Sequence, residues 1–174
     1  QCLFFLQWER LHVYAREAGV KIMGDLPIYV AEDSADAWSH PEQFQLDENL
    51  RPTEVAGCPP DGFSATGQLW GNPLFRWDYM ASDGYSWWFG RIAYQLRLFD
   101  IIRIDHFRGF ESYYAIPAGA TTAAGGRWCE GPGIRFFELL RERLGACDIV
   151  AEDLGFLTPS VHEMLAASGF PGMK

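Results

Sequence analysis

The chain has 174 residues, enough for one domain with a hydrophobic core, and its 48% hydrophobic and 21% charged residues exclude an intrinsically disordered protein. A formal net charge of −9 would repel phosphate backbones and anionic lipid surfaces, so we expect neither nucleic acid nor a membrane as a partner. Aromatic residues make up 16% of the chain, and those in Gly- and Pro-rich stretches suit flat platforms for sugars or other ligands with an apolar face.

The cysteines indicate a reducing compartment. Cys2, Cys58, Cys129 and Cys147 are scattered and form no C-x-x-C pair. We therefore expect free thiols and a cytoplasmic location. No apolar run has the length of a membrane span or of a signal-peptide core, although a chain that begins with Gln1 leaves a missing leader open.

The first elements are a helix and a short strand. Phe4, Trp8, Leu11 and Ala15 recur at spacings of four, three and four, which predicts an amphipathic helix over residues 4–18. Gly19 then ends this helix. The apolar run over residues 20–29 predicts a buried strand that continues into a loop.

The same unit recurs three times along the chain. A helix over residues 88–99 leads into a strand at 101–106, and a helix over 132–144 leads into a strand at 148–153. A last helix begins at Thr158 and ends at Gly169, before residues 170–174 start another strand. This alternation predicts an α/β fold with a parallel sheet or barrel. Four strands cannot close an eight-stranded barrel, so we expect a piece of a larger enzyme.

Residues 31–80 interrupt this alternation. The segment mixes five prolines with four glycines and has no periodicity of its own, which is typical of functional or disordered insertions. Its many aromatic residues argue against disorder. We predict an inserted subdomain that faces the substrate.

Three predicted strands end in acids, namely Asp25, Asp105 and Glu152. Catalytic groups of β/α folds come from the C-terminal ends of several strands, so these acids are candidates for one shared site. The period of two along a strand places Arg103 and Asp105 on the same side. An arginine there would keep the carboxylate ionised and oriented, as a nucleophile requires.

Glu152 ends an apolar strand, where desolvation would favour the protonated form needed by a general acid. A nucleophile and a general acid are the two carboxyl groups of retaining glycoside hydrolysis. The alternative is that these residues form structural ion pairs, and that Asp25 is a turn acid before Pro27. His106 and Asp153 have the opposite parity, so each is by itself more typical of a structural hydrogen-bonding residue. The sequence contains no Gly-rich phosphate loop, no G-x-S-x-G motif and no cluster of metal ligands, so we expect no metal and no cofactor.

Several longer motifs resemble the amylomaltase family of 4-α-glucanotransferases, also called disproportionating enzymes. They are Gly24-Asp-Leu-Pro-Ile-Tyr-Val-Ala31, Gly57-Cys-Pro-Pro-Asp-Gly-Phe-Ser-Ala-Thr-Gly-Gln-Leu-Trp-Gly-Asn-Pro-Leu-Phe75, Ile102-Arg-Ile-Asp-His-Phe-Arg-Gly109, Ala151-Glu-Asp-Leu-Gly155 and Gly169-Phe-Pro-Gly-Met-Lys174. The motifs follow the order of the family and span nearly the whole chain.

The resemblance implies a (β/α)8 TIM barrel of the α-amylase clan, of which residues 1–174 would form a central fragment from about strand three to strand six. It implies that Asp105 is the nucleophile, Glu152 the general acid/base, Arg103 the residue that positions the nucleophile and Asp25 an acid of the sugar subsites. The other predicted substrate-binding residues follow from the loop motif and from the position next to the nucleophile: Asp61, Phe63, Gln68, Trp70, Asn72 and His106.

The implied activity is the transfer of α-1,4-glucan segments between maltooligosaccharides by a retaining double displacement. The family has a third catalytic carboxylate beyond the sixth strand, which has no counterpart in these 174 residues, so we expect this chain alone to be inactive. Two alternatives stay open. One is an α-amylase-type hydrolase, and the other is a non-catalytic module that binds α-glucans.

Overall fold

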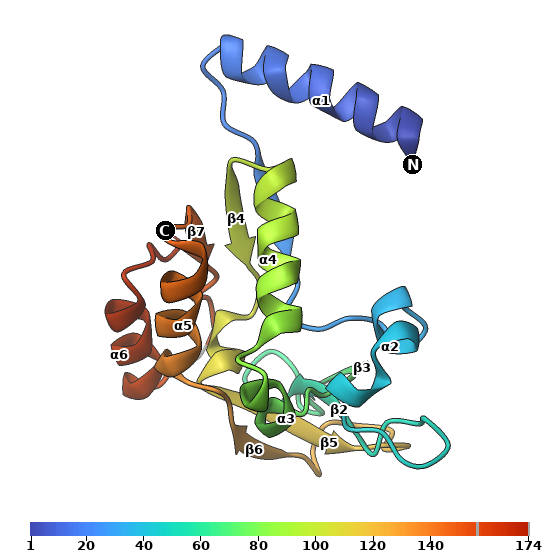
Figure 1. Ribbon diagram of the computed structural model, residues 1–174. Coiled ribbons are helices and arrows are strands. Elements are labelled where there is room, and N and C mark those ends of the chain that lie inside the picture. The colour runs from blue at the N-terminus through green and yellow to red at the C-terminus, as the bar shows by residue number, and fades with distance from the viewer. Residues whose placement is uncertain (156, 174) are drawn as a thin grey trace.

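The computed structural model describes residues 1–155 and 157–173 (Figure 1). In chain order the elements are α1 (Cys2–Glu17), β1 (Met23–Leu26), α2 (Ala35–Ser39), η1 (Pro41–Gln43), β2 (Glu54–Cys58), β3 (Gln68–Pro73), α3 (Trp77–Ser82), α4 (Ser86–Leu98), β4 (Ile101–Ile104), η2 (Phe107–Phe110), β5 (Ser112–Pro117), β6 (Arg127–Glu130), α5 (Ile134–Leu144), β7 (Ile149–Ala151) and α6 (Pro159–Ser168).

The repeated helix and strand units form a parallel sheet, so the predicted mixed α/β fold is confirmed. The strand order is β1-β4-β7, and both pairings are parallel. Because parallel strands place their C-terminal ends at one edge, the residues after β1, β4 and β7 lie along one rim. Gly172 adds an isolated parallel bridge to Ala151, where a further strand was predicted, whereas Lys174 lies outside the described residues.

The alternation along β4 divides the core from the rim. Ile102 and Ile104 are 1% and 0% exposed, and they face a core that includes Trp88 of α4 and Phe137 of α5. The intervening Arg103 is partly exposed on the other side of the sheet. The prediction that Ile102 and Ile104 face the helices while Arg103 faces away is therefore confirmed.

A second sheet is antiparallel, with the strand order β3-β2-β5-β6. None of its strands was predicted. Two of them lie within residues 31–80, and the other two follow β4, so the interrupting segment and residues 112–130 build one structure. The aromatic residues of the segment differ in burial, since Phe44 and Phe75 are 1% exposed whereas Trp38 is 85% exposed.

Helix α1 projects away from both sheets (Figure 1). The helix was predicted, but its apolar face is not fully buried, because Phe4 and Leu11 are more than half exposed. It is attached through Trp8, whose Nε1 donates to the carbonyl of Leu98 at 2.9 Å, and through His12 and Arg16, which both bind the Asp100 carboxylate at 2.9 Å. The backbone N–H of Ile22, together with these two side chains, holds the pKa of Asp100 well below its usual value.

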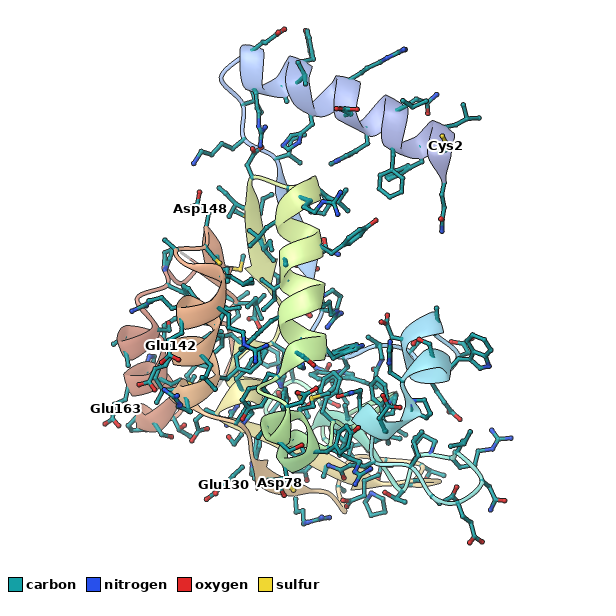
Figure 2. The ribbon with its side chains drawn as sticks, in the orientation of Figure 1. Cys2, Asp78, Glu130, Glu142, Asp148 and Glu163 are labelled. Carbon is teal, nitrogen blue, oxygen red and sulfur yellow. The ribbon has the colours of Figure 1, made fainter. Side chains whose placement is uncertain are left out.

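Acidic side chains lie around the periphery of the molecule. Figure 2 shows Glu142 on α5 and Glu163 on α6 pointing away from the core, with Asp78 and Glu130 at the bottom of the view. None of the described helices is both long and apolar enough to cross a membrane.

Candidate active site

A single arginine joins acids from two neighbouring strands. Arg103 Nη1 donates to Asp25 Oδ1 at 2.5 Å, and its Nη2 donates to Asp105 Oδ1 at 2.7 Å. The strand register explains this geometry, because Asp25 of β1 lies opposite Arg103 of β4. Partial burial acts to lower the pKa of Arg103, but the two carboxylates outweigh it and raise the pKa above its usual value. We call Asp25, Arg103 and Asp105 the rim clamp.

Glu152 comes directly after β7 and lies against the turn that follows Asp105. Its backbone N–H donates to the carbonyl of Ile104 at 2.9 Å, which continues the pairing of β4 with β7. Its carboxylate accepts two backbone N–H groups, from His106 at 3.0 Å and from Leu154 at 2.7 Å. Both oxygens of the carboxylate therefore have fixed positions beside the residue that follows Asp105.

His106 contributes to the site both through its backbone conformation and through its side chain. Its φ of 51° lies in the left-handed region, and its backbone N–H donates to Glu152. Its ring meets Trp70 edge-on at a centroid distance of 4.9 Å. Burial, reinforced by the nearby charge of Arg108 and opposed by Asp105, lowers the pKa of His106 to about 4. The imidazole is thus neutral at physiological pH.

Strand β3 brings two of the predicted sugar-binding residues to this edge. Trp70 Nε1 donates to Gln68 Oε1 at 3.0 Å, so the glutamine orients the indole that contacts His106. Asn72 has a different environment, because its Nδ2 donates to the carbonyl of Val30 at 2.9 Å. It fastens β3 to the loop that follows β1.

The loop between β2 and β3 carries the remaining predicted residues. Asp61 Oδ1 accepts the backbone N–H groups of Phe63 at 2.8 Å and of Ser64 at 2.7 Å, a local turn that shapes the loop. The Phe63 side chain is 102% exposed and points into solvent. Asp61 therefore shapes the loop that presents Phe63.

Three further residues lie beside the rim, namely Asp153, Met173 and Tyr29, and the last two were not predicted from the sequence. Asp153 Oδ1 accepts the backbone N–H of Met173 at 2.8 Å, which confirms that Asp153 is a structural hydrogen-bonding residue. The Met173 sulfur lies 3.1 Å from Arg103 Nε, so residues 171–173 cover one side of the rim clamp. Tyr29 is buried against Trp70, at a centroid distance of 6.3 Å, and burial raises its pKa. No local pattern distinguished Tyr29 or Met173, because both act through contacts between distant segments.

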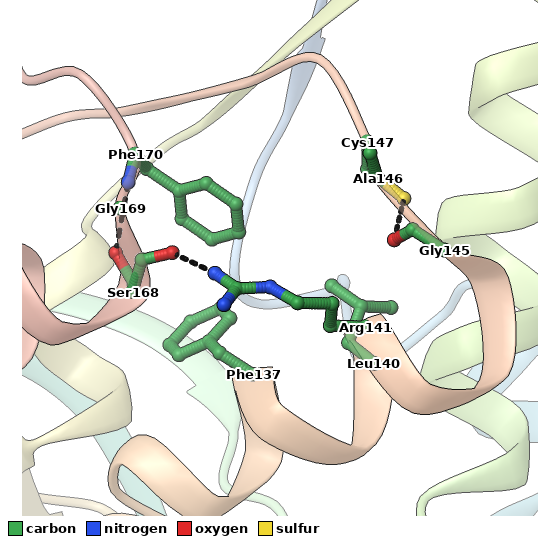
Figure 3. Close-up of a pocket in the computed structure, with 9 residues that line it drawn as sticks. All are labelled: Phe137, Leu140, Arg141, Gly145, Ala146, Cys147, Ser168, Gly169 and Phe170. Atoms are coloured by element: carbon green, nitrogen blue, oxygen red, sulfur yellow. Dashed lines mark hydrogen bonds between the residues drawn. The ribbon is translucent and has the colours of Figure 1, made fainter.

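The rim is open rather than enclosed. The side chains of Asp25 and Asp105 are 56% and 42% exposed. The pocket of ≈ 290 Å³ in Figure 3 lies elsewhere, between the C-terminal ends of α5 and α6, where Arg141 donates to the carbonyl of Ser168 at 2.5 Å. This arginine closes the end of α6 and has no direct part in the rim. The described residues contain no group of three or more acidic, His or Cys side chains placed to hold a metal ion.

Known proteins resemble the chain along its whole length. The family described as 4-alpha-glucanotransferase (Glyco_hydro_77) matches residues 1–174. The 4-alpha-glucanotransferase of Streptococcus pneumoniae serotype 4 is 55% identical to this chain over 174 residues, and that of Thermus thermophilus is 53% identical over the same length. Each match covers 100% of this chain, but only 34% of the first relative and 35% of the second. The amylomaltase of Streptococcus agalactiae, solved in complex with acarbose, has a TM-score of 0.97 at 44% identity and covers 100% of this chain and 35% of its own. The resemblance inferred from the motifs is confirmed, and the chain spans about a third of the length of these relatives.

Proposed function

Because the chain belongs to the 4-alpha-glucanotransferase family, we propose that it carries part of the active site of an enzyme that transfers α-1,4-glucan segments between maltooligosaccharides. The observation that carries the proposal is the rim clamp, since Arg103 holds the Asp105 carboxylate at 2.7 Å next to the turn that positions Glu152. Such an arrangement suits a retaining enzyme, which needs one ionised carboxylate and one proton donor at the same bond.

In the first step, an Asp105 carboxylate oxygen attacks the anomeric carbon of a glucan. The bond from that carbon to the glycosidic oxygen breaks, and Glu152 gives its proton to the departing oxygen. In the second step, Glu152 takes the proton from the 4-hydroxyl of an acceptor glucan, whose oxygen attacks the same carbon and releases Asp105. The clamp favours the first step because Arg103 holds an oxygen of the Asp105 carboxylate in a fixed position.

Transfer competes with hydrolysis at the second step, because water can replace the acceptor. An aromatic surface that binds the acceptor and excludes water favours transfer. We assign this task to residues 31–80, with Trp70 next to the rim and Phe63 on the exposed loop, and treat them as a substrate-binding subdomain completed by β5 and β6. Gln68, Asn72 and Asp61 would support these aromatic side chains, and Asp25 and His106 would border the sugar subsites.

The larger architecture is a proposal of the same kind. We infer that β1, β4 and β7 are consecutive strands of a (β/α)8 barrel, about strands three to five, with the segment around Gly172 leading into strand six. Their parallel order and the helices between them support this view. We also propose a cytoplasmic enzyme, because its cysteines are free thiols. The proposed reaction uses carboxylates as its catalytic groups, so we propose no cofactor.

The product pattern tests the function. The full-length protein is incubated with maltotriose, and its products are separated by chain length. A glucanotransferase forms oligomers longer than the substrate, whereas an α-amylase-type hydrolase forms only shorter ones. Asp105→Asn should abolish both the longer products and the trapped glycosyl-enzyme. A protein that binds maltotriose without changing it would instead be a glucan-binding module, and the proposal would be wrong.

A further inference from the structure

A pocket of ≈ 730 Å³ lies outside the rim, between α4 and the α2–η1 segment. Its size is within the range of small-molecule sites. Figure 1 shows α5 on one side of α4 and α2 on the other, so the pocket opens on the flank of α4 away from α5. None of the rim clamp residues lines it, as far as the structure describes it. We call it the α2–α4 pocket.

Two aromatic residues form its wall on α4. Trp87 and Tyr94 are seven residues apart, which places them on the same face of the helix. Trp87 is held from behind by Phe44 and Phe75, at centroid distances of 6.0 and 5.6 Å, whereas Tyr94 is 45% exposed. A fixed indole and an accessible phenol ring on one wall suit a ligand with flat apolar faces.

The facing wall offers a hydrogen-bond acceptor without a donor. Gln43 is only 5% exposed, and its Oε1 has no hydrogen-bond partner among residues 1–155 and 157–173. Its backbone groups are both satisfied, by the carbonyl of His40 and the N–H of Arg76. A buried acceptor without a partner costs about 1–3 kcal/mol. Because this oxygen is itself buried, a ligand hydroxyl would supply the missing donor only after the Gln43 side chain turns towards the pocket. The Asp36 carboxylate of the same pocket offers a further acceptor.

The charges of the pocket argue against an anionic ligand. Arg91 lies between the two aromatic residues, but its Nη1 and Nη2 already donate to the carbonyls of Ile28 at 3.2 Å and Pro27 at 2.8 Å. Burial lowers the pKa of Arg91 to about 10, so it remains a cation, and the charge of Asp36 opposes that shift. A phosphate would therefore meet an occupied guanidinium and a nearby carboxylate.

We propose that the α2–α4 pocket binds a maltooligosaccharide at a second site, separate from the rim. Aromatic faces together with amide, hydroxyl and carboxylate groups are the features that recognise a neutral sugar with several hydroxyls. The identity of the sugar rests on the proposed function. The site is also linked to the rim, because Arg91 donates to the carbonyls of Pro27 and Ile28, which directly follow β1.

Binding is measured by electrophoresis of the full-length protein through gels that contain amylose, in the Asp105→Asn background to prevent turnover. Tyr94→Ala should weaken retention about two- to tenfold, the effect of losing one aromatic contact. Tyr94→Phe, which keeps the ring, should retain most of it. Tyr79→Ala is the matched control, because Tyr79 lies outside the pocket on α3 and is 39% exposed. Crystals of the same Asp105→Asn protein soaked with maltotriose should show sugar between α2 and α4.

Equal retention of Tyr94→Ala and Tyr79→Ala, with sugar bound only at the rim, would overturn the second site. If the wild type then still makes longer oligomers from maltotriose, the proposed function stands and this inference alone fails. If the wild type makes no longer oligomers but retention still depends on Tyr94, the pocket is a glucan site and the proposed function fails.

Discussion

The backbone N–H of His106 donates to the Glu152 carboxylate at 3.0 Å, so the residue after Asp105 fixes the position of the second catalytic candidate. His106 and Glu152 are 46 residues apart along the chain. The hydrogen bond between them joins Glu152 to the turn after β4, where His106 has a φ of 51°. This turn connects the rim clamp to the proton donor of the proposed reaction.

Replacing Arg103 by lysine tests the clamp. A lysine keeps the positive charge, but one ammonium group lacks the planar fork that binds Asp25 and Asp105 together. We expect kcat for maltotriose disproportionation to fall about a hundredfold, as misplaced catalytic groups do, with little change in stability. Arg135→Lys is the control, because Arg135 also pairs with two carboxylates, those of Glu138 and Glu142, on exposed α5. A similar loss in both variants would contradict the role of the clamp.

Trp70 tests the aromatic surface beside the rim. Trp70→Ala removes the ring that contacts His106 and Tyr29, and it opens the site to water. We expect KM for maltotriose to rise about tenfold, and the ratio of hydrolysis to transfer to increase. Released glucose and longer oligomers are counted in the same assay. Tyr14→Ala, at an aromatic residue of α1 that is 70% exposed and lies outside residues 31–80, should leave both quantities unchanged.

The sequence predicted best what depends on a fixed local period. The alternation along β4 predicted that Ile102 and Ile104 are buried and that Arg103 lies beside Asp105, because side chains of a strand change faces at every residue. The antiparallel sheet was missed because its strands lack this signal. Residues 68–71 of β3 are all exposed, and β6 is exposed at three of its four positions.

Other relationships could not follow from local patterns. The contact of Glu152 with His106 requires the register of β4 against β7 and the turn after β4 together. The amphipathic pattern of α1 predicted the helix correctly but not its burial, because a pattern does not tell whether a partner surface is present. The family motifs, in contrast, gave the candidate site residues without any geometry.

Gly57 tests how β3 is held in place. A Cβ atom at Gly57 would overlap the backbone carbonyl oxygen of Gln68, so Gly57→Ala must push β2 and β3 apart. We expect the free energy of unfolding in urea to fall by about 1–3 kcal/mol, the usual cost of an overpacked site. Gly125→Ala should be neutral, because no atom lies within 4 Å of its Cβ position. If the two variants were equally stable, the close approach of β2 to β3 would be wrong.

The lowered pKa of His106 makes the free energy of unfolding depend on pH. Its pKa is about 4 in the folded protein against an ordinary value of 6.5, so between these values the unfolded chain binds a proton that the folded chain does not. Stability therefore falls as the pH falls, by about 2 kcal/mol for this residue between pH 7.5 and pH 5. Below pH 4 the folded protein also binds the proton, and the loss from this residue levels off.

The variant His106→Asn isolates this contribution, since asparagine tolerates the left-handed conformation. The difference in unfolding free energy between the wild type and the variant should shift against the wild type by about 2 kcal/mol from pH 7.5 to pH 5. His40→Asn is the control, because the His40 side chain is 49% exposed. An NMR titration gives the direct measurement, with the midpoint of the His106 ring signals near 4. A midpoint above 6 would mean that the imidazole is solvated, and that Trp70 and the turn after β4 do not enclose it.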